Sequence, residues 1–512
     1  MSGIESIDAR TGEAQPVDAV ESTPETVRAT CEVAAVAAPD LARRDLRWRS
    51  GLLEAMAGAL EEDGDAIVGA ADRETALGLP RLQGELRRTA YQLRLFARVV
   101  EEGSFLLATI DHAAETPMGP LPDIRRMVVP IGPVGVFGAS NFPLAFSVPG
   151  GDTASAVAAG CPVVIKAHPA HPATSEATFA ALARAASSLD APSGTIALVH
   201  GFAAGIALVE DPAITAVGFT GSLAAGRALF DRASARRDPI PFYGELGAAN
   251  ALVVTRSAAA ARGEEIGAGA AQSLTLGVGQ FCTQPGLLFV PEGPQGDGVV
   301  AALVAATAAV PGAHMLTGAI ADAYRAGVQS AAEVDGVRAL LASEPAVGTE
   351  VTASLFETSA ARFASAGAGV LRHECFGPVS IVVRYASGAD LDAALDALDP
   401  ALTFTIHAEP DDPNTPGLVD RASRAAGRVV MNGYPTGVGV NWAMHHGGPW
   451  PATTSPLHTS VGAASIARWL RPVAYQNVPD DLLPAALREG NPLGIPRRVD
   501  GTVVVGSHTG RA

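Results

Sequence analysis

The sequence predicts an α/β protein whose strands form parallel sheets. Between residues 130 and 255, short runs rich in β-branched residues alternate with alanine-rich stretches of helical length. Strands that alternate with helices at this spacing are typical of βαβ units. At 512 residues the chain also exceeds the usual limit of a single hydrophobic core, so we expect it to divide into two or three parts.

The elements of this region are predicted in chain order. Strands are expected at 134–138, 163–166, 195–199, 215–219 and 250–254. Helices are expected at 153–160, 173–189, 203–210 and 223–235. Because ligands of such sheets bind at the carboxyl ends of the strands, we expect the functional site at that edge.

The flanking regions extend the pattern. Residues 25–105 carry amphipathic helical patterns, which we expect to pack on the first sheet. Residues 256–430 hold a second alternation of helices and strands and predict a second domain. From about residue 432 the chain is rich in Gly, Pro, Trp and His, which predicts loops that return to a cleft.

Composition excludes several classes of function. The formal charge of -17 argues against binding to nucleic acid or to an anionic membrane surface, because phosphate groups need clustered cations. Gly, Pro and Asp interrupt every apolar run before about 18 residues, so no transmembrane helix is expected. The amino-terminal segment does not resemble a signal peptide, and the four cysteines are too scattered for a disulfide framework. We therefore expect a cytoplasmic protein with free thiols.

The basic residues contain one compositional anomaly. Of 36 lysines and arginines, only Lys166 is a lysine. Either a base-composition bias removed the others and this one remained by chance, or a compact ammonium group is needed where a planar guanidinium would not fit.

A glycine-containing turn joins a predicted strand to a predicted helix at 219–226. Its Gly221 and Ser222 can place backbone N–H groups against a pyrophosphate. Alone this signal is weak, because such turns need glycine for steric reasons and the chain lacks a clear GxGxxG fingerprint.

Three polar or nucleophilic residues follow apolar segments. Cys282 stands among small and turn-forming residues, where a thiol with a lowered pKa could act as a nucleophile, although a lone cysteine is usually a small buried hydrophobe. Glu245 ends a strand and is either a paired structural carboxylate or a base. Asn141 either makes a turn or donates its amide to an oxyanion.

Taken together, these segments resemble the aldehyde dehydrogenase superfamily in type, order and approximate spacing. The matching motifs are Asn-Phe-Pro at Asn141, the cofactor lysine at Lys166, Phe-Thr-Gly-Ser at 219–222, Glu-Leu-Gly at 245–247, Gly-Gln-x-Cys at 279–282 and Glu-x-Phe-Gly-Pro at 374–378. The resemblance implies a Rossmann-type cofactor domain, an α/β catalytic domain and a small oligomerisation hairpin.

The resemblance also implies a mechanism and the role of each residue. Cys282 attacks the aldehyde, and Asn141 and the Cys282 backbone N–H stabilise the oxyanion. Glu245 then activates the water that hydrolyses the thioester, which favours a free acid as product. No metal is expected. The implied cofactor-binding residues are Lys166, His168, Gly221, Ser222, Glu374 and Phe376.

One departure from the family pattern bears on the cofactor. Many members have a glutamate three residues after the lysine, where this chain has Pro169. The missing carboxylate removes repulsion against a 2′-phosphate, which predicts NADP, with NAD as the alternative. His168 either assists there or is a surface histidine without a role.

The segments at 138–156, around Cys282 and at 444–453 resemble the branch that contains NADP-using α-ketoglutarate semialdehyde (2,5-dioxovalerate) dehydrogenases. This implies oxidation of 2,5-dioxopentanoate to 2-oxoglutarate. The alternatives are a long-chain fatty aldehyde dehydrogenase and, from another class, a non-catalytic binding or structural protein. Candidate ligands of the substrate carboxylate are Arg125, Arg126, Thr453, Thr454 and Ser455.

The segment at 444–453 contains His446. Its ring either tunes the ionisation of Cys282 or is bonded to backbone in a loop. The resemblance further implies a homodimer or homotetramer. The expected division is a cofactor-binding domain (1–107 and 131–250), an oligomerisation hairpin (108–130), a catalytic domain (251–431) and C-terminal loops and tail that return to the active site and the subunit interface (432–512).

Overall fold

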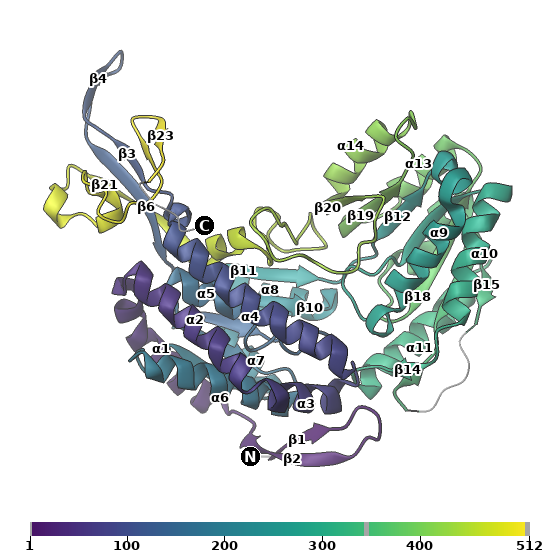
Figure 1. Cartoon of the computed structure of the whole chain (residues 1–512), viewed down its shortest axis with the longest axis horizontal. Coiled ribbons are helices and arrows are strands. Elements are labelled where there is room, and N and C mark those ends of the chain that lie inside the picture. The colour runs from purple at the N-terminus through teal and green to yellow at the C-terminus, as the bar shows by residue number, and fades with distance from the viewer. Residues whose placement is uncertain (1–2, 343–347, 507–512) are drawn as a thin grey trace.

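A computed structural model describes residues 3–342 and 348–506. Two α/β parts, each built on its own sheet, lie side by side, and a third sheet projects from the first part as an arm (Figure 1). The predicted α/β class with parallel sheets is confirmed.

The first sheet has five strands, all parallel, in the order β11-β10-β7-β8-β9. The strands are β7 (Val134–Phe137), β8 (Val163–Lys166), β9 (Ile196–Val199), β10 (Ala216–Gly221) and β11 (Phe242–Leu246). Their short, mostly buried apolar runs are typical of a sheet covered on both faces.

Helices cover both faces of this sheet. One face packs against α2 (Leu46–Glu62), α3 (Gly64–Thr75), α4 (Leu79–Glu102), α5 (Gly151–Ala159) and α6 (Pro172–Ser188). The other packs against α1 (Pro24–Arg43), α7 (Phe202–Glu210) and α8 (Leu223–Ala235). In Figure 1, α2 and α4 cross in front of the sheet.

The second sheet has seven strands in the order β15-β17-β18-β13-β12-β19-β20, parallel except for β15. They are β12 (Ala251–Val254), β13 (Leu287–Pro291), β15 (Arg338–Leu341), β17 (Ser354–Ser359), β18 (Val379–Tyr385), β19 (Ala401–His407) and β20 (Ala426–Met431). One face packs against α9 (Arg256–Thr275) and α10 (Pro294–Ala308). The other packs against α11 (Gly318–Ala332), α12 (Ala360–Ala364), α13 (Gly388–Asp396) and α14 (Thr415–Ala425).

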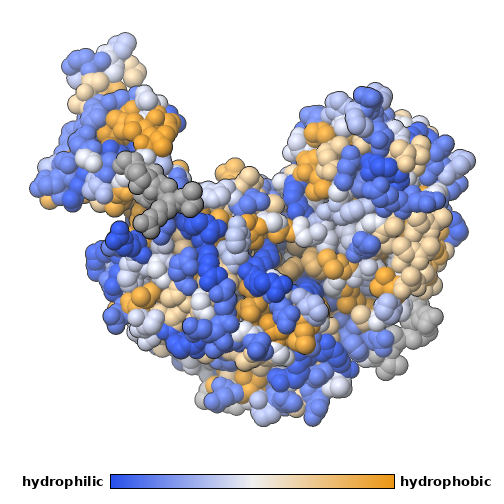
Figure 2. Space-filling model, in the orientation of Figure 1, coloured by the Kyte–Doolittle hydropathy of each residue, from blue (hydrophilic) through white to orange (hydrophobic). Residues whose placement is uncertain are grey.

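The arm is a five-stranded sheet that joins segments far apart in the chain. Its order is β21-β6-β3-β22-β23, from β3 (Thr109–Asp111), β6 (Ile124–Pro130), β21 (Leu470–Gln476), β22 (Arg497–Val499) and β23 (Thr502–Val504). The hairpin β4 (Ala114–Thr116) to β5 (Gly119–Leu121) extends from its tip. Figure 2 shows the surface hollowed between this arm and the second α/β part.

Two small antiparallel pairs complete the strands: β1 (Gly3–Ile7) with β2 (Ala14–Val20), and β14 (Ala313–His314) with β16 (Glu350–Val351). Within 3–342 and 348–506, no helix is both long and apolar enough to cross a membrane.

One predicted strand joins a different sheet from the one expected. Residues 250–254 form β12, but this strand pairs with β13 and β19 of the second sheet, and β11 completes the first. β12 is apolar and buried along its whole length, so either sheet would satisfy its pattern. The other predicted strands and helices of the first part are confirmed within two residues at each end.

Candidate active site

A cavity of about 920 Å³ opens at the carboxyl ends of the first-sheet strands. Residues that follow β7, β8, β10 and β11 form one wall, and residues 281–287, 319–331 and 370–381 of the second part form the other. Nine of the ten predicted site residues line it: Asn141, Lys166, His168, Gly221, Ser222, Glu245, Cys282, Glu374 and Phe376. Its volume suits a ligand of cofactor size.

Cys282 lies in a loop that the second sheet holds in place. After α9 the chain passes a short 3₁₀ helix (Leu276–Gly279) and turns at Gly279, whose positive φ of 64° and close approach to the Gly377 backbone exclude a side chain. Asn250, just before β12, donates its amide to the backbone oxygens of Cys282 (2.8 Å) and Gln284 (3.1 Å). These bonds fix where the half-buried thiol points.

Glu245 stands on β11 with only 4% of its surface exposed. Its Oε1 lies 2.9 Å from His446 Nε2, and its Oε2 accepts a hydrogen bond from the Ser460 hydroxyl. Burial alone would raise the pKa of this carboxyl, but the contacts with His446 and Ser460 hold the pKa below its usual range. Glu245 is therefore ionised at neutral pH and can accept a proton.

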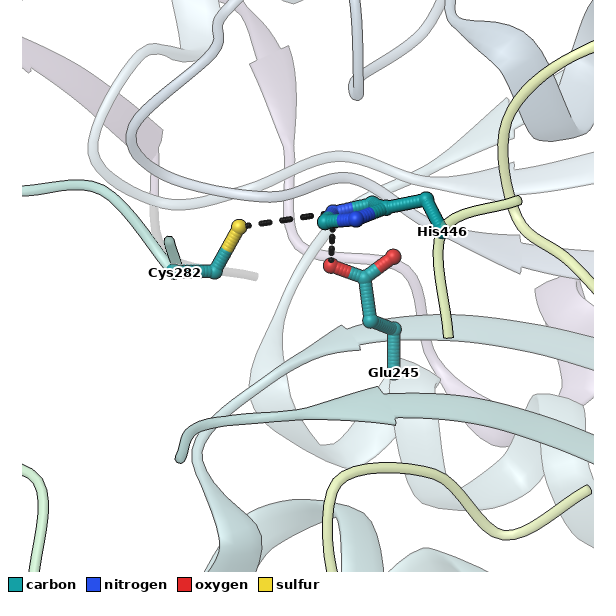
Figure 3. Close-up of side chains that lie close together, drawn as sticks. All are labelled: Glu245, Cys282 and His446. Carbon is teal, nitrogen blue, oxygen red and sulfur yellow. Dashed lines mark hydrogen bonds and ion pairs between the residues drawn. The ribbon is translucent and has the colours of Figure 1, made fainter. Parts of the chain in front are cut away.

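The His446 ring lies between the thiol and the carboxylate (Figure 3). Its Nε2 is 3.5 Å from Cys282 Sγ and 2.9 Å from Glu245 Oε1. The backbone on either side is fixed, because His446 N donates to Thr459 Oγ1 (2.8 Å) and His446 O accepts from Ser460 N (2.9 Å). One ring nitrogen thus contacts both reactive groups, and the backbone contacts hold it there.

The resting state of Cys282 differs from the expectation of a lowered pKa. Burial raises the pKa of the thiol well above its usual range, and the carboxylates of Glu245 and Glu374 raise it further. The cysteine is therefore a thiol at neutral pH, and its proton must move to a neighbouring base before it can attack. Cys282, Glu245 and His446 hold ligand atoms within 4.8 Å of one another, so a soft metal ion could also bridge them.

Asn141 is buried, and both its side chain and its backbone form hydrogen bonds. Its Nδ2 donates to the Gln280 backbone oxygen (2.9 Å), and its own backbone oxygen accepts from Arg81 (2.8 Å). These bonds tie the turn after β7 to the segment that carries Cys282. An amide nitrogen has two hydrogens, so one is left for a ligand.

The other half of the cavity presents Lys166 and His168. Lys166 ends β8, and burial lowers the pKa of its ammonium to about 8. His168 is half-buried, its Nδ1 accepts from Ala170 N (3.1 Å), and its ring stacks on His171 with centroids 5.5 Å apart. Burial keeps the pKa of His168 far below its usual range, so the ring is neutral with Nε2 as its donor.

The turn after β10 leads into the N-terminus of α8. Ser222 caps this helix, its hydroxyl accepting from Ala225 N at 3.3 Å. A side chain at Gly221 would collide with the Phe219 ring. The N-terminus of α8, with Ser222 and Ala225, lies at the cavity wall, where its positive end can meet an anion.

Glu374 and Phe376 lie on the opposite wall. Burial raises the pKa of Glu374 to about 8. A side chain at Gly247 would collide with the Glu374 carboxylate, so the glycine of the Glu-Leu-Gly motif allows the two parts of the protein to approach each other here. A half-buried carboxylate on the cavity wall suits a partner with hydroxyl donors, such as a ribose.

Two of the candidates for a substrate carboxylate are wrong. Arg125 and Arg126 lie on β6 in the arm and do not line the cavity, and the Arg125 guanidinium is occupied by Asp123 (3.0 Å) and the Leu487 backbone (2.8 Å). The Thr454 hydroxyl forms hydrogen bonds with the backbone of β11, and the Ser455 hydroxyl forms one with His458.

Sequence reasoning missed two features of the site. Ser460 contacts Glu245 across 215 positions of sequence, and no motif marks it. Arg81 and Arg88 of α4 lie against the aromatic residues that surround Cys282.

The chain is similar in sequence to a known protein family and to two relatives. Residues 2–451 match the Aldehyde dehydrogenase family. The chain is 49% identical to alpha-ketoglutaric semialdehyde dehydrogenase 2 of Azospirillum brasilense over 492 residues, 95% of this chain and 93% of the relative. It is 43% identical to alpha-ketoglutaric semialdehyde dehydrogenase of Acinetobacter baylyi over 459 residues, 89% of this chain and 87% of the relative.

Solved structures agree in fold. An NADP-dependent enzyme of E. coli superposes with a TM-score of 0.77 at 22% identity, covering 93% of this chain and 94% of that one. Aldehyde dehydrogenase 21 of Physcomitrella patens, solved with its reaction product succinate, superposes with a TM-score of 0.78 at 18% identity, covering 93% and 95%. The extent of the family match and the two relatives show that the chain belongs to the aldehyde dehydrogenase family.

Proposed function

We propose that the enzyme oxidises 2,5-dioxopentanoate (α-ketoglutarate semialdehyde) to 2-oxoglutarate, with NADP as the preferred cofactor. The contact of Cys282 and Glu245 through one nitrogen of His446, at the inner end of a cofactor-sized cavity, carries the chemical part of the proposal. The names of the two relatives support the substrate.

In the first step, Cys282 loses its proton and its sulfur bonds to the aldehyde carbon. Glu245 is the ionised base within reach, and His446 Nε2 lies where it can pass the proton or stabilise the thiolate. The free hydrogen of the Asn141 amide and the Cys282 backbone N–H are the donors for the oxyanion. Bound NAD(P) supplies the hydride acceptor.

Before the second step, Glu245 releases the first proton to solvent. It then takes a proton from a water molecule that attacks the resulting Cys282 thioester. The carbon–sulfur bond breaks, the acid leaves, and the thiol is restored. The depressed pKa of Glu245 suits this base, because the carboxylate stays ionised while buried.

The residues on the cavity wall fit the cofactor. Lys166 and the N-terminus of α8, with Gly221 and Ser222, supply positive charge and N–H donors for phosphates, and Glu374 accepts ribose hydroxyls beside Phe376. Preference for NADP rests on the absence of a carboxylate at Pro169 and on the neutral donor of His168.

A substrate panel tests the proposal. Steady-state rates with 2,5-dioxopentanoate, succinic semialdehyde and decanal, each with NAD and NADP, should give the highest kcat/KM for 2,5-dioxopentanoate with NADP. A higher kcat/KM for decanal would favour a fatty aldehyde dehydrogenase, an alternative supported by the three phenylalanines around Cys282 (Phe142, Phe146 and Phe281). Retention of NADPH production by Cys282→Ser would refute the mechanism.

We also propose a division of labour along the chain. The cofactor-binding domain comprises 1–107 and 131–250, and the catalytic domain comprises 251–431. The C-terminal segment, 432–512, returns to the active site and the subunit interface, and the hairpin at 108–130 mediates assembly into a dimer or tetramer. Exposed apolar side chains on the arm support assembly: Met118 (89% exposed), Val503 (60%) and Val504 (42%). Light scattering of the full chain tests it, and a monomer would contradict it. A cytoplasmic location is supported by the four free cysteines.

A further inference from the structure

One face of α4 carries a row of buried and half-buried charged side chains beside the active site. Arg81, Glu85 and Arg88 follow one another at spacings of four and three, so they lie on the same side of the helix. Glu85 Oε1 accepts hydrogen bonds from Leu144 N (2.9 Å) and Ala145 N (3.0 Å). The polar face of α4 therefore supports the segment that carries Asn141 and the cavity-lining aromatic residues.

Arg88 lies directly behind that aromatic wall. Its guanidinium carbon is 5.1 Å from the centroid of the Phe146 ring and 5.9 Å from that of Phe142, and both rings line the cavity that contains Cys282. The Phe146 ring in turn lies 6.4 Å from the His446 ring, which contacts the thiol. One aromatic side chain thus separates a fixed positive charge from the catalytic groups.

The hydrogen bonds of Arg88 are incomplete. Its Nη2 donates to the Val438 backbone oxygen at 3.3 Å, whereas its Nη1 is buried and has no hydrogen-bond partner among the described residues. A shielded guanidinium nitrogen without a hydrogen-bond partner is costly, and an anionic ligand that accepts from it would relieve that cost. Burial lowers the pKa of Arg88, while the negative charges of Glu85 and Glu245, and that of Cys282 once its thiol is deprotonated, raise it, so this cation interacts with the catalytic groups.

The neighbouring arginines are less suitable. Arg81 also has a buried Nη1 without a hydrogen-bond partner among the described residues, but its Nη2 donates to the Asn141 backbone oxygen and so positions a catalytic segment. Arg428 uses both terminal nitrogens on the backbone oxygens of Pro435 and Gly437. Arg88 combines a spare donor with proximity to the aromatic wall.

We propose that Arg88 binds the substrate carboxylate that lies farthest from the aldehyde carbon, and that it is the residue that selects acidic semialdehydes over neutral aldehydes. The proposal rests on the proposed function. A guanidinium binds a carboxylate with two parallel hydrogen bonds, which gives direction as well as affinity. Because Nη1 is shielded in the free enzyme, the side chain of Arg88 or Phe146 rotates to admit the carboxylate, a common adjustment on binding.

The test compares Arg88→Met with Arg87→Met in the full-length enzyme. Arg87 is the adjacent, exposed arginine, so the control variant makes the same chemical change and the same change in net charge at a solvent-exposed position of the same helix. Each enzyme is assayed with 2,5-dioxopentanoate and with pentanal, which has the same chain length but no carboxylate. The ratio of the two kcat/KM values isolates recognition of the acid from general damage.

We expect Arg88→Met to lower this ratio roughly 10- to 150-fold, mainly through KM for the acid, as for loss of a hydrogen bond to a charged group. Arg87→Met should keep the ratio within about twofold, as for an exposed site. An unchanged ratio in Arg88→Met, whether activity is kept or lost with both aldehydes, overturns the proposal. If Arg88→Met does not fold, the same ratio of kcat/KM values is measured for Arg88→Lys. An ammonium keeps the positive charge but not the two paired donors, so this ratio should still fall.

Failure of this proposal and failure of the proposed function give different results. If wild-type enzyme itself prefers pentanal to 2,5-dioxopentanoate, the proposed substrate is wrong. If wild-type enzyme prefers the acid and Arg88→Met retains that preference, only the role of Arg88 is wrong.

Discussion

Ser460→Ala tests how Glu245 is kept ionised. The Ser460 hydroxyl donates to Glu245 Oε2, and this donor is one of the contacts that hold the pKa of the carboxyl below its usual range. A hydrogen bond to a charged group contributes about 1.5–3 kcal/mol, and a pH unit corresponds to about 1.4 kcal/mol. Removing the donor should therefore raise the pKa of Glu245 by about one to two pH units.

The raised pKa of Glu245 should lower activity mainly at acidic pH. Glu245 acts as a base only when ionised, so a raised pKa protonates it at higher pH and weakens catalysis on the acidic side. We expect the acidic limb of the kcat profile to move upward in Ser460→Ala, so that the loss at pH 6 exceeds the loss at pH 8.

The assay is the pH dependence of kcat for wild-type enzyme, Ser460→Ala and Ser455→Ala. Ser455 lies in the same loop, but its hydroxyl bonds to His458 Nδ1 at 2.9 Å rather than to Glu245, so Ser455→Ala should leave the limb in place. Coincident profiles for all three enzymes, or an equal loss at every pH in Ser460→Ala alone, would refute the reasoning. A melting curve for each variant separates folding defects from catalytic ones.

Three further predictions concern other parts of the cavity. Lys166→Met should raise KM for NADP by about tenfold or more with a smaller change in KM for the aldehyde, because it removes a positive charge at the cofactor end; equal changes in both would place Lys166 elsewhere. The pKa of Glu374 is about 8 in the folded protein, above its value in the unfolded chain, so the folded state loses stability as pH rises from the unfolded pKa to about 8. Glu374→Gln should therefore raise Tm of the cofactor-free protein more at pH 9 than at pH 5. An equal change in Tm at both pH values would show that the protein does not raise the pKa of this carboxyl. Zn²⁺ should inhibit the wild-type enzyme reversibly by bridging Cys282, Glu245 and His446, and His446→Ala should be less sensitive to it; the same sensitivity in both would show that the ion binds elsewhere.

The fold could be predicted from the sequence where the pattern is local. Short apolar strands and alanine-rich helices alternate in a way that only a βαβ arrangement satisfies, and the structure has them within two residues. The sheet to which a strand belongs is not a local property. Within the strand predicted at 250–254, Ala251–Val254 are apolar and buried on both faces, so their pattern does not distinguish the first sheet from the second.

The site shows the same division between local and non-local information. Ordered motifs identified eight residues that line one cavity, and most of these motifs include the glycine or turn residue that positions them. Ser460 and Arg88 lie in no motif, and they reach the site only through contacts between distant segments. The raised pKa of the Cys282 thiol likewise depends on burial and on two carboxylates that the sequence does not place beside it.

The central claim is that Cys282 carries the acyl group and Glu245 releases it as the acid. Intact and peptide mass spectrometry of Glu245→Gln, quenched in acid during turnover with 2,5-dioxopentanoate and NADP, tests this most directly. In this variant His446 Nε2 remains as the acceptor for the thiol proton, so we expect slow formation of an added mass of the 2-oxoglutaryl group on the peptide that contains Cys282, which wild-type enzyme does not accumulate. An unmodified Cys282 in a variant that has consumed one equivalent of aldehyde, or the same added mass on the Cys375 peptide instead, would contradict it.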